Sequence, residues 1–192
     1  YGFDLNEAKT LETQLNVFAA VQPEIPKAYK ESELVFLANI DPDLQRKVLG
    51  QVSLPRLVAA DTMNYWINGK PEALRETLKL VDILLINDAE TRQLAGEANL
   101  VLAAQKILSW GPTSLVLKRG EYGALMVRNG GWFAAPALPL DSVFDPTGAG
   151  DCFAGGFIGY LANTRNYYQQ NNRNAIVMGS VMASFNVEAF SL

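Results

Sequence analysis

Residues 145–156 read DPTGAGDCFAGG, a glycine-rich segment that leads into a helical pattern. The small residues Gly148, Ala149 and Gly150 allow neighbouring backbone N–H groups to converge on one point. The N-terminus of the helix that follows adds its partial positive charge, so an anion such as a transferring phosphoryl group is stabilised there. Asp151 falls in the first helical turn, where its carboxylate is placed to take a proton from an attacking hydroxyl.

Two better-known glycine motifs do not fit this segment. No Gly-Lys-Ser/Thr follows, which excludes a Walker A loop. Phe153 stands where a dinucleotide fingerprint has its third glycine, which argues against a Rossmann oxidoreductase. A plain glycine-rich turn capped by an aspartate is the alternative, and the segment alone does not decide between the two. Cys152 is interpreted as a small buried residue rather than a reactive thiol.

Apolar runs of strand length alternate with amphipathic runs of helix length from Glu33 onward. This alternation is typical of βαβ units around a mostly parallel sheet. The predicted strands cover residues 34–40, 56–60, 82–86, 114–118, 124–128 and 132–135, with another expected at 10–18. The predicted helices cover residues 42–52, 71–80, 88–95, 99–110, 149–162 and 174–185, and residues 163–172 are expected to be a polar surface turn.

Three polar segments follow predicted strands, at the edge where open α/β sheets bind ligands. Asn87 and Glu90 come directly after one strand; a capped helix start with a solvated acid is the simpler interpretation of that pair. Lys118 stands at the end of another strand, and its ammonium group is available to phosphates or to solvent in a β-turn. The third segment begins at Asp61 and includes Asn64, which a helix cap explains equally well.

Composition narrows the classes of function. The chain has 192 residues, 49% of them hydrophobic, and a formal net charge of −4, so we expect one compact domain over residues 1–192 and no nucleic-acid partner. It has no histidine, so a general base must be another residue type, and histidine-ligated metal sites are excluded. The single Cys152 fits a reducing compartment and no apolar run is long enough to cross a bilayer, so a cytoplasmic protein without a membrane partner is expected.

The run DPTGAGD, followed shortly by AGG, resembles the motif of the ribokinase-like (PfkB) carbohydrate kinases, and Asn87-x-x-Glu90 resembles a second motif of that family. The resemblance covers residues 34–192. It implies a three-layer ribokinase-like fold and ATP-dependent phosphorylation of a hydroxyl on a sugar or nucleoside. Asp151 would be the base and the amides of Gly148, Ala149 and Gly150 the anion hole. Asn87 would lie near the phosphates, with Glu90 holding Mg²⁺ through water.

The same resemblance implies further binding residues. Gly120 and Gly123 match the family's strand-end segment at the nucleotide phosphates, whereas Lys118 stands where a threonine is usual. Gly179 and Ala183 match the last nucleotide-binding helix, although helix packing is the stronger interpretation for both. Asp145 and Thr147 match one side of a monovalent-cation (K⁺) site that some members have. Asp61 and Asn64 resemble a segment near the transferring group.

In that family the residues that recognise the sugar, and the β-stranded lid, lie in an N-terminal portion that this chain largely lacks. We therefore expect a domain that is incomplete at its N-terminus and also at its C-terminus, and the acceptor is not readable from the sequence. The sequence does not decide between a monomer and a homodimer. The rival interpretation is a catalytically silent nucleotide-binding regulatory protein of the same fold; retention of Asp151, Asn87 and Glu90 argues against it.

Overall fold

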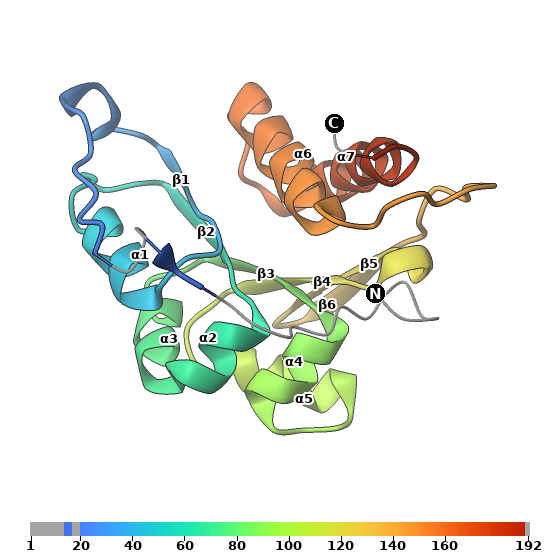
Figure 1. Ribbon diagram of the computed structural model, residues 1–192, viewed down its shortest axis with the longest axis horizontal. Coiled ribbons are helices and arrows are strands. Elements are labelled where there is room, and N and C mark those ends of the chain that lie inside the picture. The colour runs from blue at the N-terminus through green and yellow to red at the C-terminus, as the bar shows by residue number, and fades with distance from the viewer. Residues whose placement is uncertain (1–13, 17–19, 191–192) are drawn as a thin grey trace. The chain divides into compact units, whose positions relative to one another are not determined.

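The computed structural model describes residues 14–16 and 20–190 (Figure 1). The contacts divide the chain into an N-terminal unit, which ends at Leu115, and a C-terminal unit, which begins at Val116. Each unit is described by itself. The strand expected at residues 10–18 lies mostly outside the described residues, and the expectation of a single domain stays a prediction.

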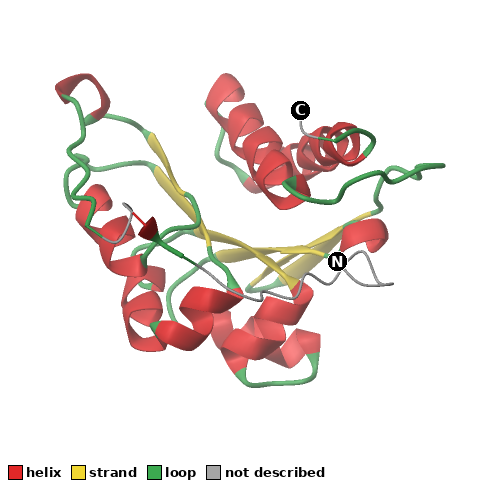
Figure 2. Cartoon of the chain, in the orientation of Figure 1, coloured by secondary structure: helices red, strands yellow, loops and turns green. Residues whose placement is uncertain are grey.

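The strands form a six-stranded sheet in the order β1-β2-β3-β4-β5-β6. Figure 2 shows the strands in yellow and the helices in red. Their bounds are β1 Leu34–Leu37, β2 Leu57–Asp61, β3 Ile83–Asn87, β4 Ser114–Lys118, β5 Ala124–Arg128 and β6 Gly131–Ala135. β1 and β3 both pair with β2 in parallel, whereas β5 and β6 form an antiparallel hairpin. The predicted α/β fold with a mostly parallel sheet is confirmed.

Five helices of the N-terminal unit follow its strands, and Figure 1 shows them on one side of β1 to β3. Their bounds are α1 Pro42–Leu49, α2 Asn64–Gly69, α3 Pro71–Leu78, α4 Asp88–Ala95 and α5 Leu100–Leu108. Asp41 caps α1 by accepting a hydrogen bond from the N–H of Asp43 at 2.9 Å, and Pro42 occupies the first helical position. Asn99 caps α5 in the same way.

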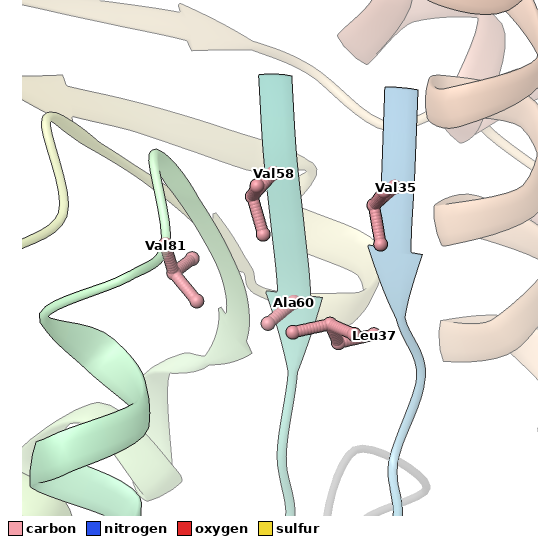
Figure 3. Close-up of a cluster of buried hydrophobic side chains, with 5 residues drawn as sticks. All are labelled: Val35, Leu37, Val58, Ala60 and Val81. Carbon is pink, nitrogen blue, oxygen red and sulfur yellow. The ribbon is translucent and has the colours of Figure 1, made fainter. Parts of the chain in front are cut away.

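A cluster of buried aliphatic side chains packs the start of the sheet (Figure 3). Val35 and Leu37 come from β1, and Val58 and Ala60 from β2. In each strand the two residues are two positions apart and therefore share one face of the sheet. Val81, just before β3, completes the cluster, and partly buried residues 48, 49 and 52 pack against it. This packing explains why the apolar runs identified in the sequence form the centre of the N-terminal unit.

Two long helices dominate the C-terminal unit: α6 Ala149–Thr164 and α7 Gln169–Val187. They approach closely because glycines face the partner helix: a Cβ added at Gly179 would lie 2.8 Å from the carbonyl oxygen of Phe153. α7 also contacts β5 and β6. The described part of the chain contains no helix that is both long and apolar enough to cross a membrane.

The structure corrects predicted boundaries in both halves of the chain. α7 begins at Gln169, so the polar segment predicted as a turn over residues 163–172 is partly helical. Asn171 is buried there, and its Nδ2 donates to Thr164 Oγ1 and to the carbonyl oxygen of Asn166, each at 2.7 Å. Those bonds tie the first turn of α7 to the end of α6. β1 also ends at Leu37, three residues before the predicted Ile40.

Candidate active site

The glycine-rich turn forms the start of α6. Gly148 is the N-cap residue, and its φ of +82° is in the left-handed region that glycine adopts without strain. The N–H of Ala149 donates to the carbonyl oxygen of Pro146 at 3.2 Å, and the first bond of the helix runs from the N–H of Cys152 to the carbonyl oxygen of Gly148 at 2.9 Å. No side chain of the described residues caps this helix start. Apart from that of Ala149, its first-turn N–H groups are therefore available to an anion.

The segment before the turn is held by α7. The N–H groups of Phe144 and Asp145 both donate to the carbonyl oxygen of Val187, at 2.7 and 3.3 Å. Asp145 Oδ1 accepts a hydrogen bond from the N–H of Thr147 at 2.9 Å. This bond is the main reason that the pKa of the Asp145 carboxyl lies below its usual range. Asp145 is thus held as a carboxylate that shapes the turn.

Two charged side chains flank the first turn of α6. Asp151 is exposed in that turn. Lys118, the last residue of β4, extends toward the turn: its Nζ is 3.0 Å from the position that a Cβ on Gly150 would take. The structure therefore brings Lys118 to the glycine-rich turn, beside the N–H groups expected to bind phosphate.

The turn between β4 and β5 contains two glycines, and the surroundings of Gly123 admit no other residue. Gly120 and Gly123 have positive φ values of +52° and +84°. A Cβ at Gly123 would lie 2.1 Å from the carbonyl oxygen of Ala135 on β6, so only glycine fits. The N–H of Arg119 donates to the carbonyl oxygen of Gly123 at 2.8 Å and closes the turn. Backbone geometry accounts for both glycines, and their contact with a nucleotide stays a prediction.

Three more sequence candidates lie in or beside the packed helices α6 and α7. Gly179 is buried against Phe153, so helix packing explains it, and Ala183 is half-buried one turn further along α7. Cys152 is a half-buried free thiol, less buried than the sequence interpretation expected. Nucleotide contacts of Gly179 and Ala183 remain predictions.

Asn186, in the last turn of α7, is a polar residue that sequence reasoning missed. Its side chain is only 6% exposed, and its Oδ1 lies 3.3 Å from the position of a Cβ on Gly148. The hydrophobic pattern of α7 gave no signal, because one asparagine in an amphipathic helix is normally read as a surface residue.

In the N-terminal unit, Asn87 and Glu90 form a capping box at the start of α4. Asn87 Oδ1 accepts from the N–H of Glu90 at 2.7 Å, and Glu90 Oε2 accepts from the N–H of Asn87 at 3.1 Å. Asn87 is also the last residue of β3, so the box fixes both side chains at the end of a parallel strand. The helix-cap interpretation is correct as far as local structure goes. It does not conflict with a ligand role, since the box also orients the carboxylate.

The strand end at Asp61 is buried rather than open. Asp61 is 5% exposed, and its carbonyl oxygen accepts from Nε2 of Gln45 at 3.2 Å. Asn64 opens α2, a helix absent from the sequence prediction, whose Trp66 is buried and meets Tyr65 edge-on at 4.7 Å between ring centroids. A cavity of about 320 Å³ lies beside this helix. Its lining residues are Leu15, Ile40, Asp41, Tyr65, Trp66, Gly69 and Lys70.

A divalent metal would have to be held by few protein groups. Within residues 14–16 and 20–190, no three His, Cys, Asp or Glu side chains form a group that could hold a metal ion. Mg²⁺ in phosphoryl-transfer sites keeps several waters and uses one or two carboxylates with the substrate phosphates. A single anchored carboxylate such as Glu90 fits that requirement, whereas a dedicated protein cage does not.

The sheet and the glycine-rich turn define an α/β protein whose helix α6 begins without a side-chain cap. Residues 17–192 match the pfkB family carbohydrate kinases, and the chain belongs to this family. Among curated relatives, the cytidine kinase of Thermococcus kodakarensis is 34% identical over 139 residues, which cover 70% of this chain and 49% of that protein.

Solved structures share the fold. Aminoimidazole riboside kinase from Salmonella enterica, complexed with aminoimidazole riboside and an ATP analog, gives a TM-score of 0.71 at 22% identity, over 84% of this chain and 58% of that one. Fructokinase from Vibrio cholerae, bound to fructose, ADP and calcium ion, gives a TM-score of 0.70 at 19% identity, and the match covers 85% of this chain and 56% of that one. The chain spans about half the length of these relatives.

Proposed function

We propose that this protein is an ATP-dependent phosphotransferase that phosphorylates a hydroxyl of a sugar or nucleoside. One arrangement carries the proposal: the uncapped first turn of α6 contains Asp151, and the ammonium group of Lys118 lies against Gly150 in the same turn. Anion-binding donors, a cation and a carboxylate are the groups that transfer of a phosphoryl group to a hydroxyl requires.

Each group has a distinct task in this mechanism. The N–H groups of Gly148, Ala149 and Gly150 bind the oxygens of the transferring phosphoryl group, and Lys118 offsets their charge. For this contact the N–H of Ala149 exchanges its 3.2 Å bond to the carbonyl oxygen of Pro146. Asp151 accepts the proton of the attacking hydroxyl as the new P–O bond forms. ATP supplies the phosphoryl group and ADP leaves. Because positioning supplies much of the rate in such transfers, the rigid attachment of the turn to Val187 is part of the catalytic design.

The remaining candidates serve the nucleotide and the ions. Asn87 would bind near the phosphates and Glu90 would hold Mg²⁺ through water, and the ion would supply neutralisation of phosphate charge. Gly120, Gly123, Gly179 and Ala183 line the nucleotide. Asp145 is ionised and, with Thr147, suits a monovalent cation. These assignments rest on matching family positions, and the capping box and the turn geometry support them locally.

The acceptor is a sugar or a nucleoside. A cytidine kinase stands among the relatives, and structures of the same fold hold a riboside or fructose with a nucleotide. A panel of pentoses, hexoses and nucleosides, incubated with the full-length protein and Mg-ATP, tests the proposal by mass spectrometry of the acceptors. We expect one class of acceptor to gain a phosphoryl group. ATP binding without transfer to any acceptor would favour the silent regulatory protein.

A further inference from the structure

Asn186 presents a buried carboxamide that the fold leaves unpaired. The side chain is 6% exposed in the last turn of α7, and its Oδ1 has no hydrogen-bond partner among the described residues. A buried polar atom without a partner is unfavourable, and such groups in native proteins usually bind a water, an ion or a ligand. The carboxamide is therefore a candidate for binding something that the protein alone does not supply.

The position of Asn186 indicates which ligand. Its carboxamide is the side chain nearest to Gly148, with Oδ1 at 3.3 Å and Nδ2 at 3.8 Å from the place of a Cβ there. Gly148 is the N-cap of α6, whose first-turn N–H groups have no side-chain cap. The neighbouring Val187 fixes the same turn by accepting two N–H bonds from the segment before it. Asn186 thus lies against an anion-binding helix start.

We propose that Asn186 is a further nucleotide-binding residue, which donates its Nδ2–H to a phosphate oxygen bound at the Gly148 turn; this rests on the proposed function. A half-turn about the Cβ–Cγ bond exchanges Oδ1 and Nδ2, and the unpaired Oδ1 gives up no hydrogen bond in that rotation. The surrounding charge favours a donor to an anion, since the helix start is positive and Lys118 Nζ lies against Gly150 in the same turn.

α7 offers a matched control. Asn172 is also an asparagine on this helix, is 5% exposed, and likewise has an Oδ1 without a partner among the described residues, but it lies in the first turn of α7. Asn186→Leu and Asn172→Leu each replace an unpaired buried amide by an apolar side chain of similar size. Both variants are expected to keep or raise the thermal stability of the protein, because an unsatisfied polar group is removed.

Calorimetry with inorganic tripolyphosphate and with Mg-ATP tests the proposal in the full-length protein. Asn186→Leu should lower the affinity for both ligands by roughly 10- to 100-fold, the effect of losing a hydrogen bond to a charged group. Asn172→Leu should leave both affinities unchanged. Asn186→Asp should weaken them further, because a carboxylate repels phosphate. The proposal is supported if Asn186→Leu has the melting temperature of wild type but a weaker affinity for tripolyphosphate.

Three results would overturn the inference. Unchanged affinity in Asn186→Leu would make the residue a packing group. Equal losses in both leucine variants would assign the effect to the helix rather than to the contact. Asn186→Asp binding better than wild type in potassium, but not in sodium, would show that the carboxamide serves a cation. Failure of wild type itself to bind tripolyphosphate or ATP would instead contradict the proposed function.

Discussion

At the scale of single residues, Glu90 has two roles that a substitution can separate. Its Oε2 closes the capping box with the N–H of Asn87, and its negative charge is the proposed attraction for hydrated Mg²⁺. Glutamine at the third helical position also supports a capping box, because its amide oxygen accepts the same bond. A Glu-to-Gln change therefore keeps the local structure and removes the charge.

Glu90→Gln is predicted to raise the Mg²⁺ concentration for half-maximal rate by roughly tenfold, since an amide holds the ion's hydration shell less well than a carboxylate. Thermal stability should change little because the box is retained. A magnesium titration of initial rates checks this, with Glu72→Gln in the first turn of α3 as the control for losing a helix-start carboxylate. An unchanged titration would leave Glu90 with its capping role alone.

At the scale of elements, two glycines with positive φ flank β5, one on each side. Gly123 and Gly130 have φ values of +84° and +88°, so both are in the region that L-residues avoid. A Cβ at Gly130 would meet nothing within 4 Å, whereas one at Gly123 would lie 2.1 Å from the carbonyl oxygen of Ala135. Gly123 is therefore under a steric constraint that Gly130 lacks.

Gly130→Ala is predicted to lower the free energy of unfolding by about 1–2 kcal/mol, the cost of a left-handed L-residue. Gly123→Ala should cost several kcal/mol, of the order seen for severe overpacking, because β5 and β6 must separate to admit the methyl group. Urea denaturation measures both. Similar losses of free energy of unfolding in the two variants would mean that the turn relaxes enough to avoid the clash at residue 123.

A second element prediction concerns the junction of α1 and α3. Lys70 Nζ donates to Asp41 Oδ2 at 2.7 Å and to Asp43 Oδ2 at 2.8 Å. The hydrogen bond from Lys70 lowers the pKa of Asp43, and the bond to Asp41 is the main cause that raises the pKa of Lys70. These side chains are partly exposed, so solvent screens the attraction.

Lys70→Met is predicted to destabilise the protein by about 0.5–1 kcal/mol at pH 7. A lowered Asp pKa contributes stability above the unfolded value near 4, and this contribution disappears as the pH falls through the folded value. The free energies of unfolding of wild type and Lys70→Met should therefore converge in acid, as urea titrations at pH 7 and about pH 3 would show. Lys79→Met, which loses only a surface pair with Glu76, is the control. The same difference in free energy of unfolding at both pH values would contradict a stabilising role for the ion pairs of Lys70.

The sequence predicted the bounds of α4, β4 and β5 because each begins and ends at clear signals: an Asn cap before α4, and turn glycines around the two strands. It missed α2, which has no side-chain cap and forms because Trp66 and Ile67 are buried. It also gave no signal for Asn186, since the proximity of that residue to Gly148 arises only when α6 and α7 pack.

At the scale of the whole molecule, the chain belongs to the pfkB family carbohydrate kinases and spans about half the length of the relatives named above. Its C-terminal unit contains Asp151, Lys118 and the glycine-rich turn together. Its N-terminal unit contains the Asn87–Glu90 box.

The most direct test of the account is transfer of the labelled γ-phosphoryl group of ATP to the preferred acceptor by the full-length protein and by its Asp151→Asn variant. Asparagine keeps the size of the side chain and cannot accept the proton, so turnover should fall by about two to four orders of magnitude, the usual contribution of a general base. ATP affinity, measured by calorimetry on the same samples, should be largely retained. Near-normal transfer by Asp151→Asn would contradict the assignment of the base and with it the proposed mechanism.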